Sequence, residues 1–158
     1  NIMIVISACL AGMKVRYDGR DNLYPKIQQL VDEKKAVTVC PEVFGGLPTP
    51  RNPAEIIGGD GEDVLDGNAK VVDNTGKDVT AEFLAGANKT LEIAKQVGAT
   101  IVILKQNSPS CGSDMIYNGE FNGTKVKGIG VTTALLRRNG MQVVSEEDFL
   151  QYLPTIKL

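Results

Sequence analysis

The run Met-Ile-Val-Ile-Ser at residues 3–7 is a short, continuous stretch of mainly β-branched residues near the start of the chain. Such a run is typical of a strand that is covered on both faces, as in a parallel sheet. The same pattern returns in Ala-Val-Thr-Val-Cys at residues 36–40 and in Ile-Val-Ile-Leu-Lys at residues 101–105. These three runs predict the central strands of one buried sheet.

Segments with apolar residues at helical spacing separate the predicted strands. They occupy residues 26–35 and residues 80–98, where Thr80 is the expected N-cap. A further helix is expected within residues 128–139, followed by a last strand at residues 142–144. Because strands alternate with helices, the sequence predicts an α/β fold with a mostly parallel, Rossmann-like sheet flanked by helices.

Two other segments do not follow this alternation. Residues 56–79 contain several glycine turns between short β-branched runs, which predicts a small hairpin insertion. Residues 41–53 (PEVFGGLPTPRNP) are so rich in Pro and Gly that we expect a loop without helix or strand. A length of 158 residues fits a single domain spanning residues 1–158.

Composition and charge narrow the class of protein. Seventeen basic and nineteen acidic residues are interspersed and give a net charge of −2, so we expect no nucleic-acid partner. The longest apolar runs are too short to cross a bilayer and resemble no signal segment, so we expect a cytoplasmic protein without a membrane partner. A small molecule is the expected partner, and the protein is expected to be a monomer or a homodimer.

The three cysteines, Cys9, Cys40 and Cys111, each follow a different predicted strand. Loops after the carboxyl ends of parallel strands meet at one edge of a sheet, so the three thiols are expected to lie together. They are either buried packing residues or ligands of a metal site. With no histidine and no CxxC pair, they match no local zinc motif. Three thiolates could hold an iron-sulfur cluster with one open iron, or zinc with a bound water.

Polar residues accompany the second and third cysteines. Glu42 could exchange a proton, and Ser108 or Ser110 could orient a substrate; the alternatives are a solvated loop carboxylate and turn-capping hydroxyls. Arg51 and Asp114 could bind a polar substrate or be ordinary surface charges. A classical serine nucleophile is not expected, because the chain has no histidine to activate it.

Several uncommon motifs resemble those of the thiouracil desulfidase family, small bacterial proteins formerly grouped as a domain of unknown function. The motifs are SACL at 7–10, RYDG at 16–19, CPEV at 40–43, GGLPTPR at 45–51 and SPSCG at 108–112. The resemblance covers essentially the whole chain. It implies a non-redox enzyme that replaces the sulfur of a thiolated pyrimidine such as 2-thiouracil by oxygen, giving uracil.

The resemblance also implies roles for individual residues. Cys9, Cys40 and Cys111 would hold a [4Fe-4S] cluster whose fourth iron takes the substrate sulfur. Glu42 would be the acid/base and Ser108 a catalytic serine.

One position departs from the family pattern, because Val15 stands where many relatives carry a further cysteine. A cysteine at this position is therefore not needed for a three-cysteine site. A non-catalytic metal- or sulfur-binding carrier or sensor is the alternative that fits the same ligands.

Overall fold

A four-stranded parallel sheet forms the centre of the computed structural model, which describes residues 3–8, 25–99, 101–146 and 148–149. Its strands are β1 (Ile4–Ser7), β2 (Ala36–Val39), β5 (Ile101–Leu104) and β8 (Gln142–Ser145), in the spatial order β2-β1-β5-β8. The predicted α/β class and the predicted parallel strands are confirmed. The single domain over residues 1–158 stays a prediction, because both ends of the chain lie outside the described residues.

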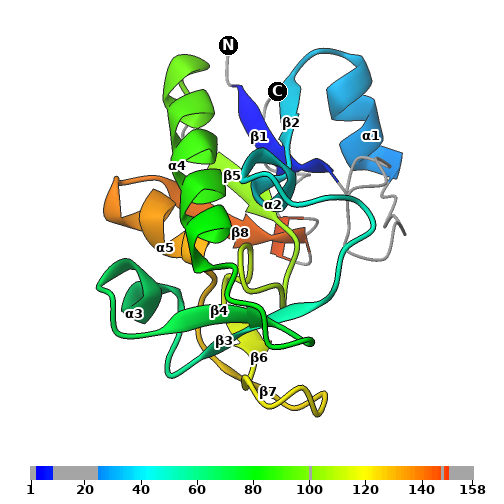
Figure 1. The fold of residues 1–158 in the computed structure, drawn as a ribbon. Coiled ribbons are helices and arrows are strands. Elements are labelled where there is room, and N and C mark those ends of the chain that lie inside the picture. The colour runs from blue at the N-terminus through cyan, green and yellow to red at the C-terminus, as the bar shows by residue number, and fades with distance from the viewer. Residues whose placement is uncertain (1–2, 9–24, 100, 147, 150–158) are drawn as a thin grey trace.

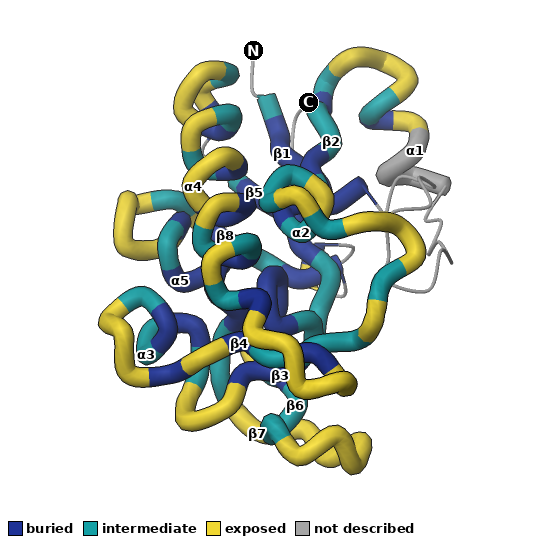
Figure 2. Tube along the Cα trace, in the orientation of Figure 1, coloured by how far each residue is buried: buried dark blue, intermediate teal, exposed yellow. Residues whose placement is uncertain are grey.

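Helices cover both faces of this sheet (Figure 1). On one face, Ile4 and Ile6 pack with Leu30 of α1 (Pro25–Asp32). On the other face, Val5 and neighbouring strand residues pack against α4 (Thr80–Gln96) and α5 (Val131–Arg138). Alternate residues of β1 thus face opposite layers, which explains why its sequence is apolar throughout. Figure 2 shows the resulting contrast between buried strands and exposed outer helix faces.

Two antiparallel hairpins lie beyond one end of the sheet (Figure 1). The predicted insertion is confirmed as β3 (Ala54–Ile57) and β4 (Lys70–Asp73), with the short helix α3 (Gly61–Leu65) between them. The second hairpin consists of β6 (Met115–Tyr117) and β7 (Lys125–Lys127). Both hairpins contribute to a third apolar cluster, which also contains residues of α4 and α5.

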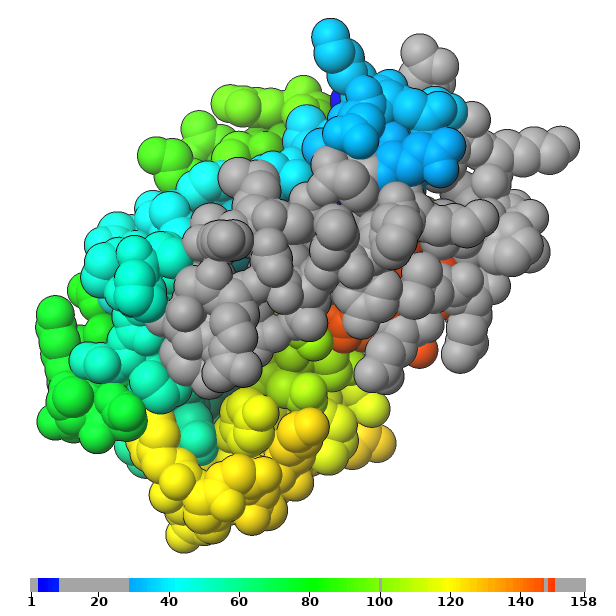
Figure 3. Space-filling view, turned by 90° about the vertical axis from the view of Figure 1, so that its right-hand side faces the viewer, coloured from blue at the N-terminus to red at the C-terminus, as the bar shows by residue number. Residues whose placement is uncertain are grey.

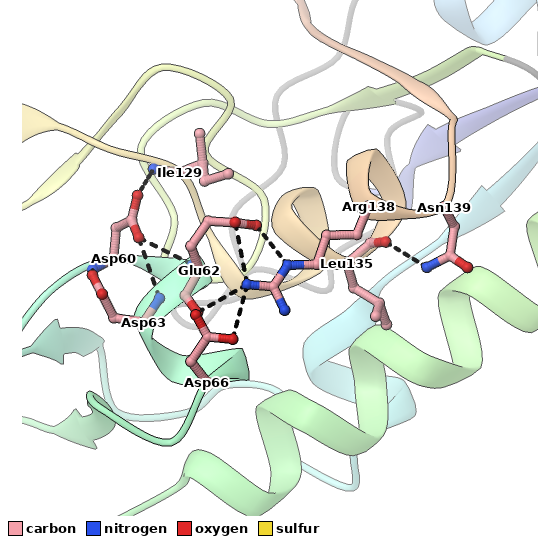
Figure 4. A network of polar contacts seen from close by, with 8 residues as sticks. All are labelled: Asp60, Glu62, Asp63, Asp66, Ile129, Leu135, Arg138 and Asn139. Atoms are coloured by element: carbon pink, nitrogen blue, oxygen red, sulfur yellow. Dashed lines mark hydrogen bonds and ion pairs between the residues drawn. The ribbon is translucent and has the colours of Figure 1, made fainter.

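Polar contacts attach α3 to the N-terminal and C-terminal ends of α5 (Figure 4). Asp60 caps α3 through the backbone N–H of Glu62 at 3.0 Å and also accepts from the N–H of Ile129 at 3.3 Å. At the other end of α5, Arg138 forms ion pairs with Glu62 and Asp66, both at 3.1 Å. The inserted hairpin is therefore tied to the layer that covers the sheet.

Two predictions about local structure are wrong. Residues 41–53 are not entirely loop, because Pro41–Phe44 form the short helix α2; a proline at the first helical position loses no helical hydrogen bond. Thr80 is not the N-cap of α4, since Val79 occupies that position. The Thr80 hydroxyl instead accepts from the backbone N–H of Val71 in β4 at 2.9 Å, and Asp78 accepts from the N–H of Thr80 at 2.9 Å.

None of the helices in the described part of the chain combines the length and the apolar character needed to span a membrane.

Candidate active site at the carboxyl ends of the strands

A cavity of about 890 Å³ opens where the ends of β1, β2 and β5 meet the two hairpins. Cys40, which directly follows β2, and Cys111, in the loop after β5, both line it together with Ser7 at the end of β1. The structure therefore brings these two cysteines to one cavity, as predicted. Cys9 and Val15 lie outside the described residues.

The helix α2 holds Cys40 and its neighbours by close backbone packing on α4. A Cβ atom on Gly45 would overlap the carbonyl oxygen of Glu82, and one on Gly86 would overlap the carbonyl oxygen of Pro41. Glycine at both positions is what allows this close approach. Gly45 belongs to the GGLPTPR motif at 45–51 and Gly86 to no motif, and the sequence alone did not indicate the packing role of either glycine.

Glu42 and Arg51 form an ion pair in the cavity wall. Arg51 Nε donates to Glu42 Oε2 at 2.8 Å, and Nη2 of Arg51 contacts the same oxygen. The Arg51 side chain is 6% exposed and that of Glu42 is 16% exposed. Arg51 also donates to the carbonyl oxygen of Pro48 at 3.1 Å and to the hydroxyl of Thr49 at 3.2 Å. Arg51 is thus held within the site and is not an ordinary surface charge.

The same guanidinium lies beside a cysteine, since Arg51 Nη2 is 3.9 Å from Cys40 Sγ. Burial raises the pKa of the Cys40 thiol, and the charge of Glu42 raises it further. The backbone N–H of Val43 and the charge of Arg51 act in the opposite direction. The net effect holds the pKa of the Cys40 thiol above its ordinary value, with burial as the main cause.

The loop after β5 is organised by the side chain of Gln106. Its Oε1 accepts from the backbone N–H groups of Ser113, Asp114 and Met115 at 2.9, 3.1 and 3.3 Å. Its backbone N–H in turn donates to both carboxylate oxygens of the buried Glu146 at 3.2 Å. Gln106 thereby closes the loop that carries Cys111. Sequence reasoning missed Gln106 and Glu146; only the position of Gln106 directly after the strand was a signal.

Ser108 lines the cavity and also shapes the turn before Cys111. Its hydroxyl oxygen accepts from the N–H of Cys111 at 2.7 Å and from the N–H of Ser110 at 3.2 Å. Ser108 therefore caps the turn and also lines the cavity. Because the oxygen accepts these two bonds, the hydroxyl hydrogen can still be donated.

Ser110 and Asp114 are placed differently. Ser110 is 1% exposed, and its hydroxyl lies 2.7 Å from that of Thr132 in α5. Asp114 is exposed, and its carbonyl oxygen accepts from the N–H of Gly128. Neither residue is among the described residues that line the cavity, so the arrangement gives no support to a direct contact with substrate.

The donor set at the cavity fits a thiophilic group. Cys40 and Cys111 follow the two strands that flank β1, and Cys9 comes two residues after the end of β1 in the sequence. Thiolates are the ligands that iron-sulfur clusters and zinc share. Among the described residues alone, no three Cys, His, Asp or Glu side chains form a group that could hold a metal ion.

Comparison with known proteins identifies the family. The model of the 2-thiouracil desulfurase family matches residues 4–148. The chain belongs to this family. The match extends from β1 to beyond β8 and so includes both cysteine loops and both hairpins. The family that the motifs resembled is thereby confirmed.

Two known proteins are similar to this chain over nearly their whole length. The uncharacterized protein YbbK of Bacillus subtilis (strain 168) is 58% identical over 146 residues, which cover 92% of this chain and 97% of that protein. The solved structure of the [4Fe-4S]-dependent thiouracil desulfidase TudS is 46% identical, with a TM-score of 0.83. The match covers 98% of this chain and 95% of that one. The α/β fold is therefore the one that TudS adopts.

Proposed function

We propose that this member of the 2-thiouracil desulfurase family removes sulfur from a small thiolated pyrimidine such as 2-thiouracil. The observation that carries the proposal is the convergence of Cys40, Cys111, Glu42 and Ser108 on one cavity at the strand ends. The 46% identity to a [4Fe-4S]-dependent thiouracil desulfidase supports the same chemistry. In the overall reaction water supplies oxygen to the carbon, the carbon–sulfur bond breaks, and sulfur leaves as sulfide without net transfer of electrons.

Cys9, Cys40 and Cys111 would hold a [4Fe-4S] cluster as the resident cofactor. A cluster with three cysteine ligands supplies an iron that is open to a sulfur ligand and polarises it. The protein's part is to hold the thiolates in place. Pro41, Leu47 and Phe83 add apolar surface to the cavity wall.

Glu42 would exchange protons between water and the reacting group. Its Oε2 is occupied by Arg51, whereas no donor among the described residues reaches its Oε1. The ion pair fixes the carboxylate in the wall of the cavity that Cys40 also lines. A carboxylate held in this way is suited to general acid/base work, which this chain must perform without histidine.

Ser108 would orient the substrate by donating its hydroxyl hydrogen. The serine oxygen already accepts two backbone hydrogen bonds, so its rotation is restricted and its O–H direction is defined. 2-Thiouracil offers its carbonyl oxygen and its thiocarbonyl sulfur as acceptors to such a donor. Ser108 acts here as a positioning donor, and the activation of a nucleophile by histidine is not required.

Turnover by Glu42→Gln tests the proposal against a carrier or sensor that binds metal without catalysis. We expect loss of 2-thiouracil absorbance to slow by roughly 10²–10⁴-fold, the usual contribution of a positioned acid or base. Iron content should stay at the wild-type value, because glutamine keeps an oxygen acceptor for Arg51. Glu92→Gln, at an exposed position of α4, is the matched control and should leave turnover unchanged. Iron-loaded wild type that never consumes 2-thiouracil would contradict the enzyme proposal.

A further inference from the structure

Glu55 is a buried carboxylate at the end of the cavity that the hairpins form. It lies in β3, is 8% exposed, and lines the cavity with Tyr117 and Phe121 of the second hairpin. Neither the sequence motifs nor the proposed chemistry uses it. A carboxylate buried to this degree needs hydrogen bonds that compensate its lost hydration.

Those hydrogen bonds come from the loop that connects β6 to β7. Glu55 Oε1 accepts from the backbone N–H of Gly119 at 2.9 Å and from that of Phe121 at 3.2 Å. The contacts span 64 and 66 residues of sequence, so they join two separate hairpins. Figure 3 shows the second hairpin in yellow, beside the cyan-to-green segment that contains β3 and β4.

The loop needs such an anchor because its backbone adopts unusual conformations. Gly119 has a φ of +89°, and a Cβ there would lie 2.6 Å from the carbonyl oxygen of Ile56. Phe121 has a φ of +54°, which is unfavourable for a residue with a side chain. Its side chain is also among the exposed large apolar groups. Within the loop, the described side-chain bonds come from Asn118, Glu120 and Asn122, all close in sequence.

We propose that Glu55 is a positioning residue that fixes residues 118–124 and thereby sets the aromatic wall of the substrate cavity. This inference rests on the proposed function for its kinetic consequence only. Charge-assisted bonds from two backbone N–H groups to one carboxylate oxygen are stronger than neutral ones. With the loop fixed, Tyr117 and Phe121 bound the cavity at its hairpin end. Without the anchor, the wall would have to be ordered each time a substrate binds.

Glu55→Ala and Glu55→Gln test the proposal by two independent readouts. The first is hydrogen exchange at the amides of Gly119 and Phe121, with the amide of Val102 in β5 as internal control. Glu55→Ala should speed exchange at both loop amides and leave Val102 unchanged. Glu55→Gln keeps one oxygen acceptor and should preserve most of the protection.

The second readout is the kinetics of 2-thiouracil turnover. Glu55→Ala should raise KM about tenfold, the change expected when one or two hydrogen bonds that hold the cavity wall are lost. The value of kcat should stay within about twofold, because the reacting groups at the other end are unaltered. Glu55→Gln should resemble wild type in both constants, and Glu92→Gln at an exposed position of α4 is the matched control.

Three results would overturn the proposal. Unchanged exchange in Glu55→Ala would show that Glu55 does not hold the loop. A fall in kcat with constant KM would place Glu55 in the chemical step. A KM for Glu55→Gln as high as that of Glu55→Ala, with the amides still protected, would indicate direct contact with substrate. If the wild type shows no turnover at all, the proposed function is wrong. The exchange experiment then tests, without any kinetic data, whether Glu55 holds the loop.

Discussion

The segment after β2 and the segment after β5 each place a cysteine on the same cavity, yet they are stabilised by different kinds of contact. The first uses charge and close packing: Arg51 pairs with Glu42, and α2 lies against the glycine backbone of α4. In the second, neutral side chains hold the turn at Cys111: the amide of Gln106 and the hydroxyl of Ser108 accept backbone N–H bonds, while the buried carboxylate of Glu146 accepts from the N–H of Gln106.

This difference suggests a division of work between the two loops. A charged pair at the edge of a cavity can exchange protons, and it tolerates partial exposure to water. The Gln106 amide and the Ser108 hydroxyl fix the geometry around Cys111 without carrying a charge themselves. We therefore expect substitutions in the first loop to affect chemistry as well as structure. Those in the second should act mainly on how firmly the metal is held.

Removal of a cysteine should have the largest effect in either loop. Cys40→Ser and Cys111→Ser each replace a predicted thiolate ligand by a hydroxyl, which binds iron-sulfur clusters poorly. After anaerobic reconstitution, we expect most of the iron and the brown colour to be lost, together with turnover. Iron content and visible absorbance measure this directly. Full iron loading of both variants would refute the ligand assignment.

Gln106→Ala should produce the next largest effect, confined to the second loop. The change leaves the N–H groups of Ser113, Asp114 and Met115 without their acceptor. Loss of an outer contact that orients a ligand typically costs about 10–100-fold in metal affinity or activity. The rate of iron loss to a chelator is the measurement. Iron retention equal to wild type would mean that the loop holds Cys111 without Gln106.

These two loops also show what the sequence could and could not predict. The strand-end position of Cys40 and Cys111 followed from hydrophobic patterning, because parallel strands place their following loops at one edge. The ion pair of Glu42 with Arg51 could not be derived, since a segment with a sequence separation of nine can fold in many ways. The acceptor role of Gln106 depends on a turn that brings residues 113–115 back to it, and no local motif encodes that turn.

The wrong predictions have a common physical cause. The composition of residues 41–53 favours a loop, but packing of α2 against Gly86 stabilises one helical turn there. Thr80 has the preference of an N-cap, but its hydroxyl bonds to the neighbouring strand β4 instead. In both cases a tertiary contact overrides a local preference. The positions of Glu55 and Glu146 likewise depend on tertiary contacts that join distant segments.

Gly86→Ala would test the close packing behind the first loop. In an exposed helix this change usually stabilises a protein by about 0.5–1 kcal/mol. Here the added methyl overlaps the carbonyl oxygen of Pro41, so we expect destabilisation by about 1–3 kcal/mol. Urea denaturation measures the free energy of unfolding, and Ala85→Gly at the neighbouring exposed position controls for helix propensity. A more stable Gly86→Ala protein would contradict the packing argument.

Ser110→Ala should have the smallest effect. The Ser110 hydroxyl bonds to Thr132 in the interior, away from the cavity lining. Its removal should cost about 1 kcal/mol of unfolding free energy, since Thr132 loses a buried partner. Turnover and KM should remain within about twofold of wild type. A large increase in KM with unchanged stability would instead place Ser110 in the substrate site.

The central claim is tested most directly by measuring uracil formation and iron content on the same anaerobically reconstituted sample. We predict about four irons per chain, the content of one [4Fe-4S] cluster. We also predict repeated conversion of 2-thiouracil to uracil with release of an equal amount of sulfide. Protein stripped of iron should form no uracil. Iron-loaded protein that leaves 2-thiouracil intact, or iron-free protein that converts it equally well, would contradict the account.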